Sequence, residues 1–564
     1  MALPKSWRDL VGTSGRFVLA VDWYEEGTLY FSDQSFTLGS DQGDLQVESG
    51  LGSITVNRAN ASPEVRIEID TQRVDWLASW RRGLFIERIP ARLYRWHTGD
   101  TLEDTRLLVD GFLGSVSLAD PTARGRLAGV LRTRDRSVGQ LLPSTTIETS
   151  AIPAIIVPGA SLPGVLTAGG PSLGLSRPEV FGRPGTPDAA PAVPLLELTL
   201  NDDTLAAGGG TPKPAVWMLC GHALRTSAVR IWTMGVPNFV ADATVVLEQD
   251  LLLRSFSVVE FITNPWGSSA ADRVNTGGEY WWGFLDTGAV VQEGRSNPYR
   301  PGDLRGLGDV LRYLYERIGG RKIDLGRMES YAADLNQYQI DCVLTEPVEL
   351  QEWIDGEILR VYPVRIIEGP QGLYCRRRTF RATEADAVVT LTTRSTAGIL
   401  VAADSPLTPM DVTLCTQIRV EYGFRELKTY TKSVTAGVTP GTVAREEDST
   451  LRQGGAHFAE IGEPYVGTVD AVLEVPTTWD PATAQRLALD FLDREALPRF
   501  RRSYVGGAEL EGLTLGDVVR LDDADLDADQ IRLATIEDIQ IGGSSVRVTV
   551  ELLRDPLLYD VPTS

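Results

Sequence analysis

Apolar and polar residues alternate along much of the first 135 residues, and this period of two predicts antiparallel β-strands. The segment 16–33 carries two apolar and aromatic runs around Glu25-Glu26-Gly27, a pattern typical of a hairpin. A short helix is predicted at "DWLASWRRG" (75–83). These elements indicate a β-barrel or sandwich with one helix packed against it. Further strands are predicted at 65–70, 91–96 and 107–118.

The pattern changes in residues 141–215, where Pro and Gly are frequent and apolar residues are scattered. Such a composition favours an extended, irregular chain that follows a surface. Long connections of this kind are commonly functional loops or arms. We therefore expect a connector or arm here, with β-structure resuming at "AVWMLCG" (215–221).

A helical period stands out within the mixed region 216–410. Between 302 and 320, apolar residues recur at i, i+3, i+4 and i+7, with Asp303 placed to cap the helix and Gly319-Gly320 placed to end it. A second helix is predicted at 347–360. Strands are expected to follow it, so this region mixes helices with β-structure.

The pattern returns to β in residues 411–564, interrupted by one amphipathic helix at 479–497. Asp480 is placed to cap that helix, and Pro481 suits its first turn. A final meander is predicted at 529–553, with Gly542-Gly543 as its turn. We expect a C-terminal barrel with a packed helix.

One stretch of that barrel, "LEGLTLGDVVRLDD" (510–523), has the alternation of a strand but carries an acidic residue at a position of the apolar face. Four apolar residues share one parity and can line one face of an extended chain. Asp517 has the same parity, so Gly516 must let the strand bend or bulge and turn the carboxylate outward. The stretch predicts a bent strand of a small barrel. The four apolar residues are Leu513, Leu515, Val519 and Leu521.

The predicted fold class is mainly β (β+α), with two tube-like β-barrel domains flanking a mixed α/β middle region and a few amphipathic helices. A chain of 564 residues is too long for a single core. The chain shows no repeat with a period of 20–50 residues, which disfavours a solenoid or propeller. The predicted divisions are an N-terminal tube-like barrel at 1–140, the connector at 141–215, the middle region at 216–410 and the C-terminal barrel at 411–564.

Charge and hydropathy argue against nucleic-acid binding, membrane binding and a membrane span. The chain has 54 basic and 76 acidic residues, a formal net charge of −22. This balance disfavours tight binding to nucleic acid or to an anionic membrane, because phosphate affinity comes from clustered Lys and Arg. The N-terminal segment does not resemble a secretory signal, and no apolar run has the length of a membrane span. We expect synthesis in the cytosol, without a membrane span.

Residues that carry chemistry are few and scattered. The four cysteines, Cys220, Cys342, Cys375 and Cys415, lack the close spacing of paired metal ligands. His222 lies two positions from Cys220, which suggests a nucleophile and base, but no oxyanion or serine-nucleophile motif accompanies them. The acidic run at 522–529 resembles a calcium loop without the Gly and Glu of an EF-hand, so a solvated turn is favoured over a weak cation site. We expect no catalytic residues, metal or cofactor.

Aromatic residues are concentrated in the stretch 264–284. Exposed aromatic side chains can grip a partner protein or stack on sugars, and buried ones belong to a core. Three interpretations therefore remain: partner contact, sugar binding and plain core. The candidate contact residues are Trp266, Tyr280, Trp281 and Trp282.

The order of elements resembles the tail-tip baseplate hub proteins of tailed phages of the siphophage or gene-transfer-agent type. The strand "QIRVEYGF", the helix "ATAQRLALDFLDREALPR" and the turn "LTLGDVVRL" resemble their second barrel. "LYFSD", "VRIEID" and "RLYRW" resemble their first, tube-like barrel, and "RPEVFGRPG" resembles a linking segment. The segment "YQIDCVLTEPVELQEWIDGEILRVYPVRIIEGPQGLYCRRR" resembles their middle domain.

The resemblance implies a structural virion protein at the tail tip. It implies a homotrimer whose two barrels per subunit form a ring, joining the six-fold tail tube to three-fold tip or fibre proteins. Distal tail and tail tube proteins, receptor-binding proteins for host attachment and the tape-measure protein would be its partners. The genome would pass through the ring without specific binding, as an acidic bore repels it. Some relatives carry clustered cysteines for an Fe–S centre; here the cysteines are dispersed, so no such cofactor is expected.

Two alternatives belong to other classes. The chain could be a hexameric distal-tail ring component. It could instead be a glycan-binding or glycan-hydrolysing module that uses the aromatic residues of 264–284 and a carboxylate pair. A trimer favours the hub, a hexamer favours the ring component, and a monomer with sugar affinity favours the glycan module.

Overall fold

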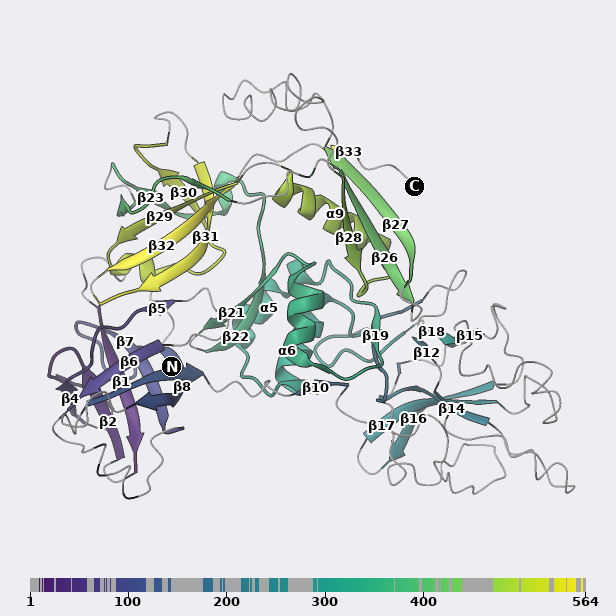
Figure 1. Ribbon diagram of the computed structural model, residues 1–564, viewed down its shortest axis with the longest axis horizontal. Coiled ribbons are helices and arrows are strands. Elements are labelled where there is room, and N and C mark those ends of the chain that lie inside the picture. Colours follow the sequence, from purple (N-terminus) through teal and green to yellow (C-terminus); the bar gives the residue numbers. More distant parts are fainter. Residues whose placement is uncertain are drawn as a thin grey trace, which may run out of the picture.

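A computed structural model gives the arrangement of the chain (Figure 1). Two β-barrels lie one above the other at the left of the view, and a mixed middle region lies beside them. In the described residues no helix is long and apolar enough to cross a membrane. The structure describes residues 10–553 and 559–560 except for several gaps of five residues or fewer and longer gaps within 58–64, 72–87, 118–125, 134–139, 144–175, 186–192, 198–214, 233–242, 262–287, 439–469 and 527–531.

The N-terminal region forms an eight-stranded sheet in the order β3-β4-β2-β1-β7-β8-β9-β6. The predicted hairpin at 16–33 is confirmed as β1 and β2, with Gly27 in a positive-φ conformation at the turn. Trp76, in the predicted helix, is fully buried and packs edge-on against Trp23. The strands are β1 (Gly15–Trp23), β2 (Gly27–Ser32), β3 (Phe36–Leu38), β4 (Leu45–Ser49), β6 (Val65–Asp70), β7 (Pro90–His97), β8 (Arg106–Ser117) and β9 (Arg126–Thr133).

The segment that follows β4 closes this sheet into a barrel. The amides of Gly50 and Leu51 both donate to the carbonyl of Ser32 at the end of β2. On its other side the segment pairs with β6, where the Asp70 amide donates to the Gly50 carbonyl and Leu51 bridges Ile69. A ring of six strands, β2-β1-β7-β8-β9-β6, is therefore closed by residues 50–52.

The C-terminal region contains a second closed barrel. Its six strands run β24-β23-β30-β31-β32-β29, and the pairing of β24 with β29 completes the ring. Residues 387–409, which sequence order places in the middle region, supply three strands to this sheet. The strands are β23 (Ala387–Thr392), β24 (Ile399–Ala403), β25 (Thr408–Pro409), β29 (Phe500–Gly506), β30 (Val518–Asp522), β31 (Arg532–Ile541) and β32 (Val546–Leu552).

The stretch 510–523 adopts the predicted bend. Leu515 and Val519 are buried, and Gly516 between them has a φ of 81°. That conformation turns Asp517 to accept a 2.8 Å hydrogen bond from Arg376 and another from the Thr514 amide. The extended part is shorter than expected, because a 3-10 turn, η8 (Ala508–Gly512), precedes the bend and β30 follows it.

The middle region contains the predicted helix at 302–320 with a later start. Helix α4 (Leu307–Tyr313) continues as a π-helical turn, η4 (Leu314–Ile318), and ends at Gly319. The prediction that Asp303 caps this helix is wrong, because the cap position is Gly306 and the Asp303 carboxylate pairs with Arg183. The predicted second helix is confirmed as α6 and η5. The remaining elements are α5 (Leu325–Leu335), α6 (Leu350–Trp353), η5 (Ile354–Leu359), β21 (Val364–Gly369), β22 (Gly372–Arg377) and η6 (Glu384–Asp386).

The helix predicted at 479–497 is α9 (Pro481–Glu495), with Asp480 capping the Thr483 amide at 2.8 Å. It packs on a separate four-stranded sheet, β28-β26-β27-β33, through buried Leu487 and Leu492. The strands of this sheet are β26 (Gln417–Arg425), β27 (Thr429–Val438), β28 (Asp470–Val475) and β33 (Tyr559–Asp560).

Smaller sheets attach the connector to the middle region. Strand β10 (Leu141–Leu142) pairs with β20 (Val348–Glu349), and β11 (Glu179–Phe181) pairs with β19 (Cys342–Leu344). Two further sheets have the orders β12-β18-β15 and β13-β14-β17-β16. Their strands are β12 (Val193–Pro194), β13 (Leu196–Glu197), β14 (Ala215–Cys220), β15 (Val229–Trp232), β16 (Ala243–Leu251), β17 (Arg254–Phe261) and β18 (Gly288–Val291).

Candidate functional site

The two barrels meet at a buried group of charged side chains. Arg95 of β7 donates to the Glu511 carboxylate, with Nε 2.9 Å and Nη2 2.8 Å from Oε1. The two side chains are only 1% and 0% exposed. Arg95 also donates to the carbonyl of Gly543, and Arg106 donates to the carbonyl of Glu511 at 2.6 Å. The N-terminal barrel therefore contacts η8 and the last turn of the C-terminal barrel.

Strand β7 places Arg95 and His97 at this junction because of its alternation. Buried and half-buried residues alternate along the strand, and Arg95 and His97 share the buried parity of Ala91 and Leu93. The Arg95 guanidinium lies over the ring of Phe17, 4.7 Å from its centroid. Two charged or titratable residues therefore occupy positions where the strand pattern calls for apolar side chains.

His97 adds a second contact to Glu511. Its Nε2 lies 3.4 Å from Glu511 Oε2, and its Nδ1 lies 3.7 Å from Asp100 Oδ2. Burial alone would raise the pKa of Glu511, but the hydrogen bond from His97 and the charge of Arg95 hold that pKa below its ordinary value. The Glu511 carboxylate is therefore ionised at neutral pH and neutralises the buried guanidinium.

Backbone pairing joins the barrels a second time. Strand β5 (Val56–Asn57) belongs by sequence to the N-terminal region, yet it pairs with β31 of the C-terminal barrel, Asn57 with Gln540 and Val56 with Ile541. In Figure 1, β5 lies between the two barrels. The ion pair and the strand pairing together fix the orientation of the barrels, because each contact limits rotation of one barrel about the other contact.

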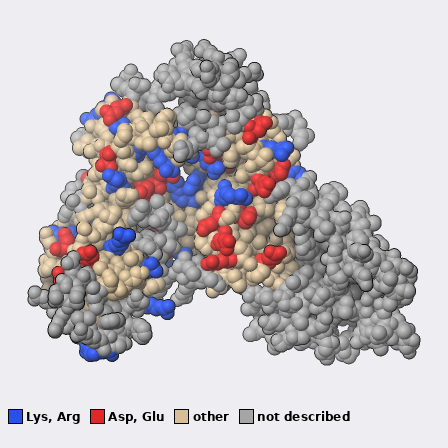
Figure 2. Space-filling model, in the orientation of Figure 1, with Lys and Arg blue, Asp and Glu red and all other residues tan. Residues whose placement is uncertain are grey.

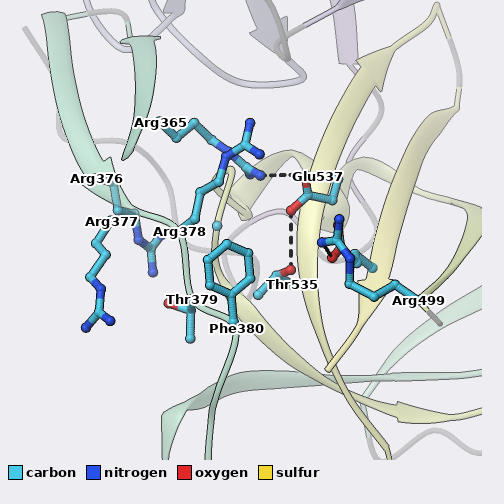
Figure 3. Close-up of a pocket in the computed structure, with 11 residues that line it drawn as sticks. Arg365, Arg376, Arg377, Arg378, Thr379, Phe380, Arg499, Thr535 and Glu537 are labelled. Atoms are coloured by element: carbon cyan, nitrogen blue, oxygen red, sulfur yellow. Dashed lines mark hydrogen bonds and ion pairs between the residues drawn. The ribbon is translucent and has the colours of Figure 1, made fainter. Parts of the chain in front are cut away.

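A pocket lies where the hairpin β21–β22 faces the C-terminal barrel (Figure 3). Arg365 is directed at β31, where it donates to the Ile536 carbonyl at 2.8 Å and contacts Glu537 at 2.5 Å. Glu537 occupies the irregular position of β31, between Ile536 and Asp538. Figure 2 shows Lys and Arg side chains gathered at the centre of this face, between the C-terminal barrel and the middle region.

Cys220 and His222 do come together, but as a structural pair. The Val180 amide donates to His222 Nε2 at 3.0 Å, so this nitrogen accepts and Nδ1 carries the proton of the neutral ring. Nδ1 faces the Cys220 sulfur at 3.9 Å, and the thiol itself donates to the His222 carbonyl at 3.1 Å. A protonated Nδ1 cannot take the thiol proton, so this geometry does not activate a nucleophile.

Asp522, Asp523 and Asp525 of the acidic run have protein partners, whereas Asp527 and Asp529 lie outside the described residues. Asp522 accepts from Thr392 Oγ1 at 2.8 Å, and Asp523 accepts from the Tyr504 hydroxyl at 2.6 Å. Asp525 pairs with Arg502. No group of three or more His, Cys, Asp or Glu suited to a metal ion occurs among the described residues, and the side chains of all four cysteines are buried thiols.

The candidate partner-contact residues Trp266, Tyr280, Trp281 and Trp282 lie outside the described residues. The barrel junction and the arginine-lined pocket were not predicted from the sequence. The only sequence signal for the junction is Arg95 and His97 at the apolar parity of β7. For the pocket it is the run Arg376-Arg377-Arg378 at the end of a strand.

No protein-family model matches the chain, and no curated protein sequence matches it. Solved structures resemble it in fold. One comes from the virion of a native gene transfer agent particle, with a TM-score of 0.42, 14% identity and coverage of 68% of this chain and 85% of that chain. Another is the tail protein from Neisseria meningitidis MC58, with a TM-score of 0.33, 6% identity and coverage of 95% and 96%.

A third is the 43 kDa tail protein of prophage MuSo2 from Shewanella oneidensis, with a TM-score of 0.32, 9% identity and coverage of 96% and 99%. Identities this low concern the fold alone, and with TM-scores below 0.5 the function is argued from the residues of this chain.

Proposed function

We propose that this chain is a structural baseplate hub of a tailed-phage tail tip, a homotrimer whose barrels form a ring around the DNA ejection channel. The observation that carries the proposal is the fixed pairing of two closed six-stranded barrels within one chain. Three subunits would then present six similar barrels. Such a ring can match a six-fold tail tube on one side and a three-fold tip or fibre on the other.

The junction supports a ring because a ring needs a fixed angle between neighbouring barrels. Arg95 and Glu511 are buried with less than 2% exposure, and β5 extends a sheet of the opposite barrel. A shift of the junction that broke this pair while Arg95 stayed buried would leave a guanidinium without its counter-charge, at a cost of about 3–5 kcal/mol. The two barrels of a subunit would therefore move as one body.

Charge supports passage of DNA without retention. A net charge of −22 gives the protein a field that repels polyphosphate, which keeps the genome from adhering to a channel wall. We propose that distal tail, tail tube, tape-measure and receptor-binding proteins are the partners, and that the hub acts without catalysis. The site of action would be the virion tail tip, after synthesis in the host cytoplasm.

The mass of the purified chain in solution tests this proposal. Native mass spectrometry or light scattering should give an assembly of three 61.5 kDa chains, formed either alone or on addition of a tail-tube or distal-tail protein. The barrel-junction variant Glu511→Gln should lower the assembled fraction, whereas Glu384→Gln, an exposed charge on the C-terminal barrel, should not. A hexamer, or a chain that stays monomeric with the tail proteins present, contradicts the hub.

A further inference from the structure

Five arginines line the pocket between β21–β22 and the C-terminal barrel, together with two glutamates. The space is about 350 Å³ when its opening to solvent is counted, but only about one water fits between the lining atoms, so a ligand would lie at the opening. Guanidinium groups this close repel one another unless carboxylates lie between them. The distribution of those carboxylates therefore decides what the pocket can bind.

Four of the five arginines each have their own carboxylate. Arg365 pairs with Glu537 and Arg499 pairs with Glu551, both within the pocket. The other two arginines pair with carboxylates that do not line the pocket. Arg376 reaches Asp517 at 2.8 Å, and Arg377 reaches Asp490 at 2.8 Å.

Arg378 is the remaining arginine, and among the described residues no carboxylate forms an ion pair with it. Its backbone amide is fixed by the Pro363 carbonyl at 2.7 Å, while the residue stays exposed to solvent. Surrounding protein atoms and the charge of Arg365 lower the pKa of Arg378, with Glu537 and Glu551 acting in the opposite direction. One guanidinium in the pocket thus has no ion-pair partner of its own among the described residues.

We propose that this pocket binds a single carboxylate, held by the Arg378 guanidinium between the hairpin β21–β22 and the C-terminal barrel. The match is one of charge and of shape, since one guanidinium has no ion-pair partner of its own among the described residues and its planar fork pairs with a planar carboxylate through two hydrogen bonds. Glu537 and Glu551 disfavour a dianion such as phosphate, which would bring a second negative charge toward them.

The carboxylate can come from a free small acid or from an Asp or Glu side chain of a second copy of this chain. Both sources present the same group to Arg378. The proposal therefore stands whether or not the chain forms the hub ring, because it concerns the pocket within one subunit.

Thermal unfolding of the full chain in sodium acetate, compared with sodium chloride at equal ionic strength, tests the proposal. Acetate should raise the unfolding midpoint of the wild-type chain, with an increase that follows the logarithm of its concentration, because it binds the folded state. Arg378→Gln should abolish this increase. Arg360→Gln, another exposed arginine but outside the pocket, should retain it.

Loss of the acetate effect in both variants, its retention in Arg378→Gln, or its absence in the wild type overturns the proposal. Inorganic phosphate stabilises proteins by exclusion as well, so the comparison uses the part of each midpoint shift that Arg378→Gln removes. That part should be smaller for phosphate than for acetate, and a larger value for phosphate overturns the carboxylate assignment. A second measurement needs only the wild-type chain: the width of the carboxyl resonance of isotope-labelled acetate in a nuclear magnetic resonance spectrum. That resonance should broaden with protein and sharpen on addition of unlabelled acetate, and an unchanged line width counts against the site.

The oligomeric state separates the two sources. If the carboxylate belongs to a second copy, acetate should dissociate wild-type oligomers and Arg378→Gln should not form them. If it is a free acid, acetate should leave the oligomeric state unchanged while still raising the midpoint. Either result supports the site and names its ligand.

Discussion

Arg95 and Glu511 lie 416 positions apart in the sequence, yet they form a fully buried ion pair with an N–O distance of 2.8 Å. The pair joins β7 of the N-terminal barrel to η8, the 3-10 turn that precedes the last three strands of the C-terminal barrel. Because neither group is solvated, the pair is tightly coupled to the relative position of the barrels. Substitution of either residue should therefore destabilise the contact between the two barrels.

Removing the charge of Glu511 tests that coupling. We expect Glu511→Gln to lower the free energy of unfolding by about 3 kcal/mol, because Arg95 would remain buried without a counter-charge. Urea unfolding followed by circular dichroism measures the change.

The matched control is Glu384→Gln, whose carboxylate pairs with Arg520 while 67% exposed. Its effect should stay below about 1 kcal/mol because exposed ion pairs contribute little. Equal effects of the two variants would show that the junction does not stabilise the protein.

The same carboxylate predicts a dependence of stability on pH. The folded-state pKa of Glu511 is lowered from 4.5, so its contribution is complete above that value and is lost as the pH falls through the lower, folded-state pKa. The unfolding midpoint should therefore fall as the pH is lowered from about 5. The fall should be shallower in Glu511→Gln, and identical pH profiles of variant and wild type would contradict the lowered pKa.

The core of the C-terminal barrel should not tolerate charge at 515 or 519. Leu515 is 2% and Val519 is 0% exposed. Leu515→Asp and Val519→Asp should each cost several kcal/mol, roughly the stability of a domain, because the carboxylate has no partner there. Loss of folded protein or of cooperative unfolding is the readout. Val388→Asp, at a 52% exposed position of β23, is the control and should fold normally.

Two glycines should respond to alanine with opposite signs. Gly516 has a φ of 81°, and a Cβ there would lie 3.3 Å from the Arg376 side chain, so Gly516→Ala should destabilise the protein by about 1 kcal/mol. Gly356 lies in the helical segment η5, where a Cβ would meet open space. Gly356→Ala should stabilise by about 0.5 kcal/mol. The melting temperatures of both variants test the prediction. An unchanged melting temperature in Gly516→Ala would contradict the requirement for glycine at the bend.

Alternation predicted many of the strands because their inner faces are apolar. Val65–Asp70 and Pro90–His97 show the expected period of two, and Asp480 and Pro481 begin a helix as predicted. Helix α5 was missed although its buried residues Met328, Ala332 and Leu335 follow the helical i, i+4, i+7 period and Asp324 caps its first turn. Asp303 misled the start of α4 because its carboxylate serves an arginine from a distant segment instead of the helix end.

Barrels were expected, but the strands that close each of them and the contact between the two could not be predicted. Three strands from residues 387–409 join strands more than 90 positions later, and their register depends on pairing that leaves no local signal. The candidate sites depend on ion pairs such as Arg365–Glu537, whose partners are 172 positions apart. In the sequence, charged residues that form such ion pairs cannot be distinguished from charged residues on a solvated surface.

An electron cryo-microscopy reconstruction of the assembled particle that carries this chain tests the proposed architecture. We expect three copies at the tail tip, with the N- and C-terminal barrels of each copy alternating around the channel and joined through Arg95 and Glu511. Six copies in a ring, or barrels that lie away from the channel wall, would contradict the hub.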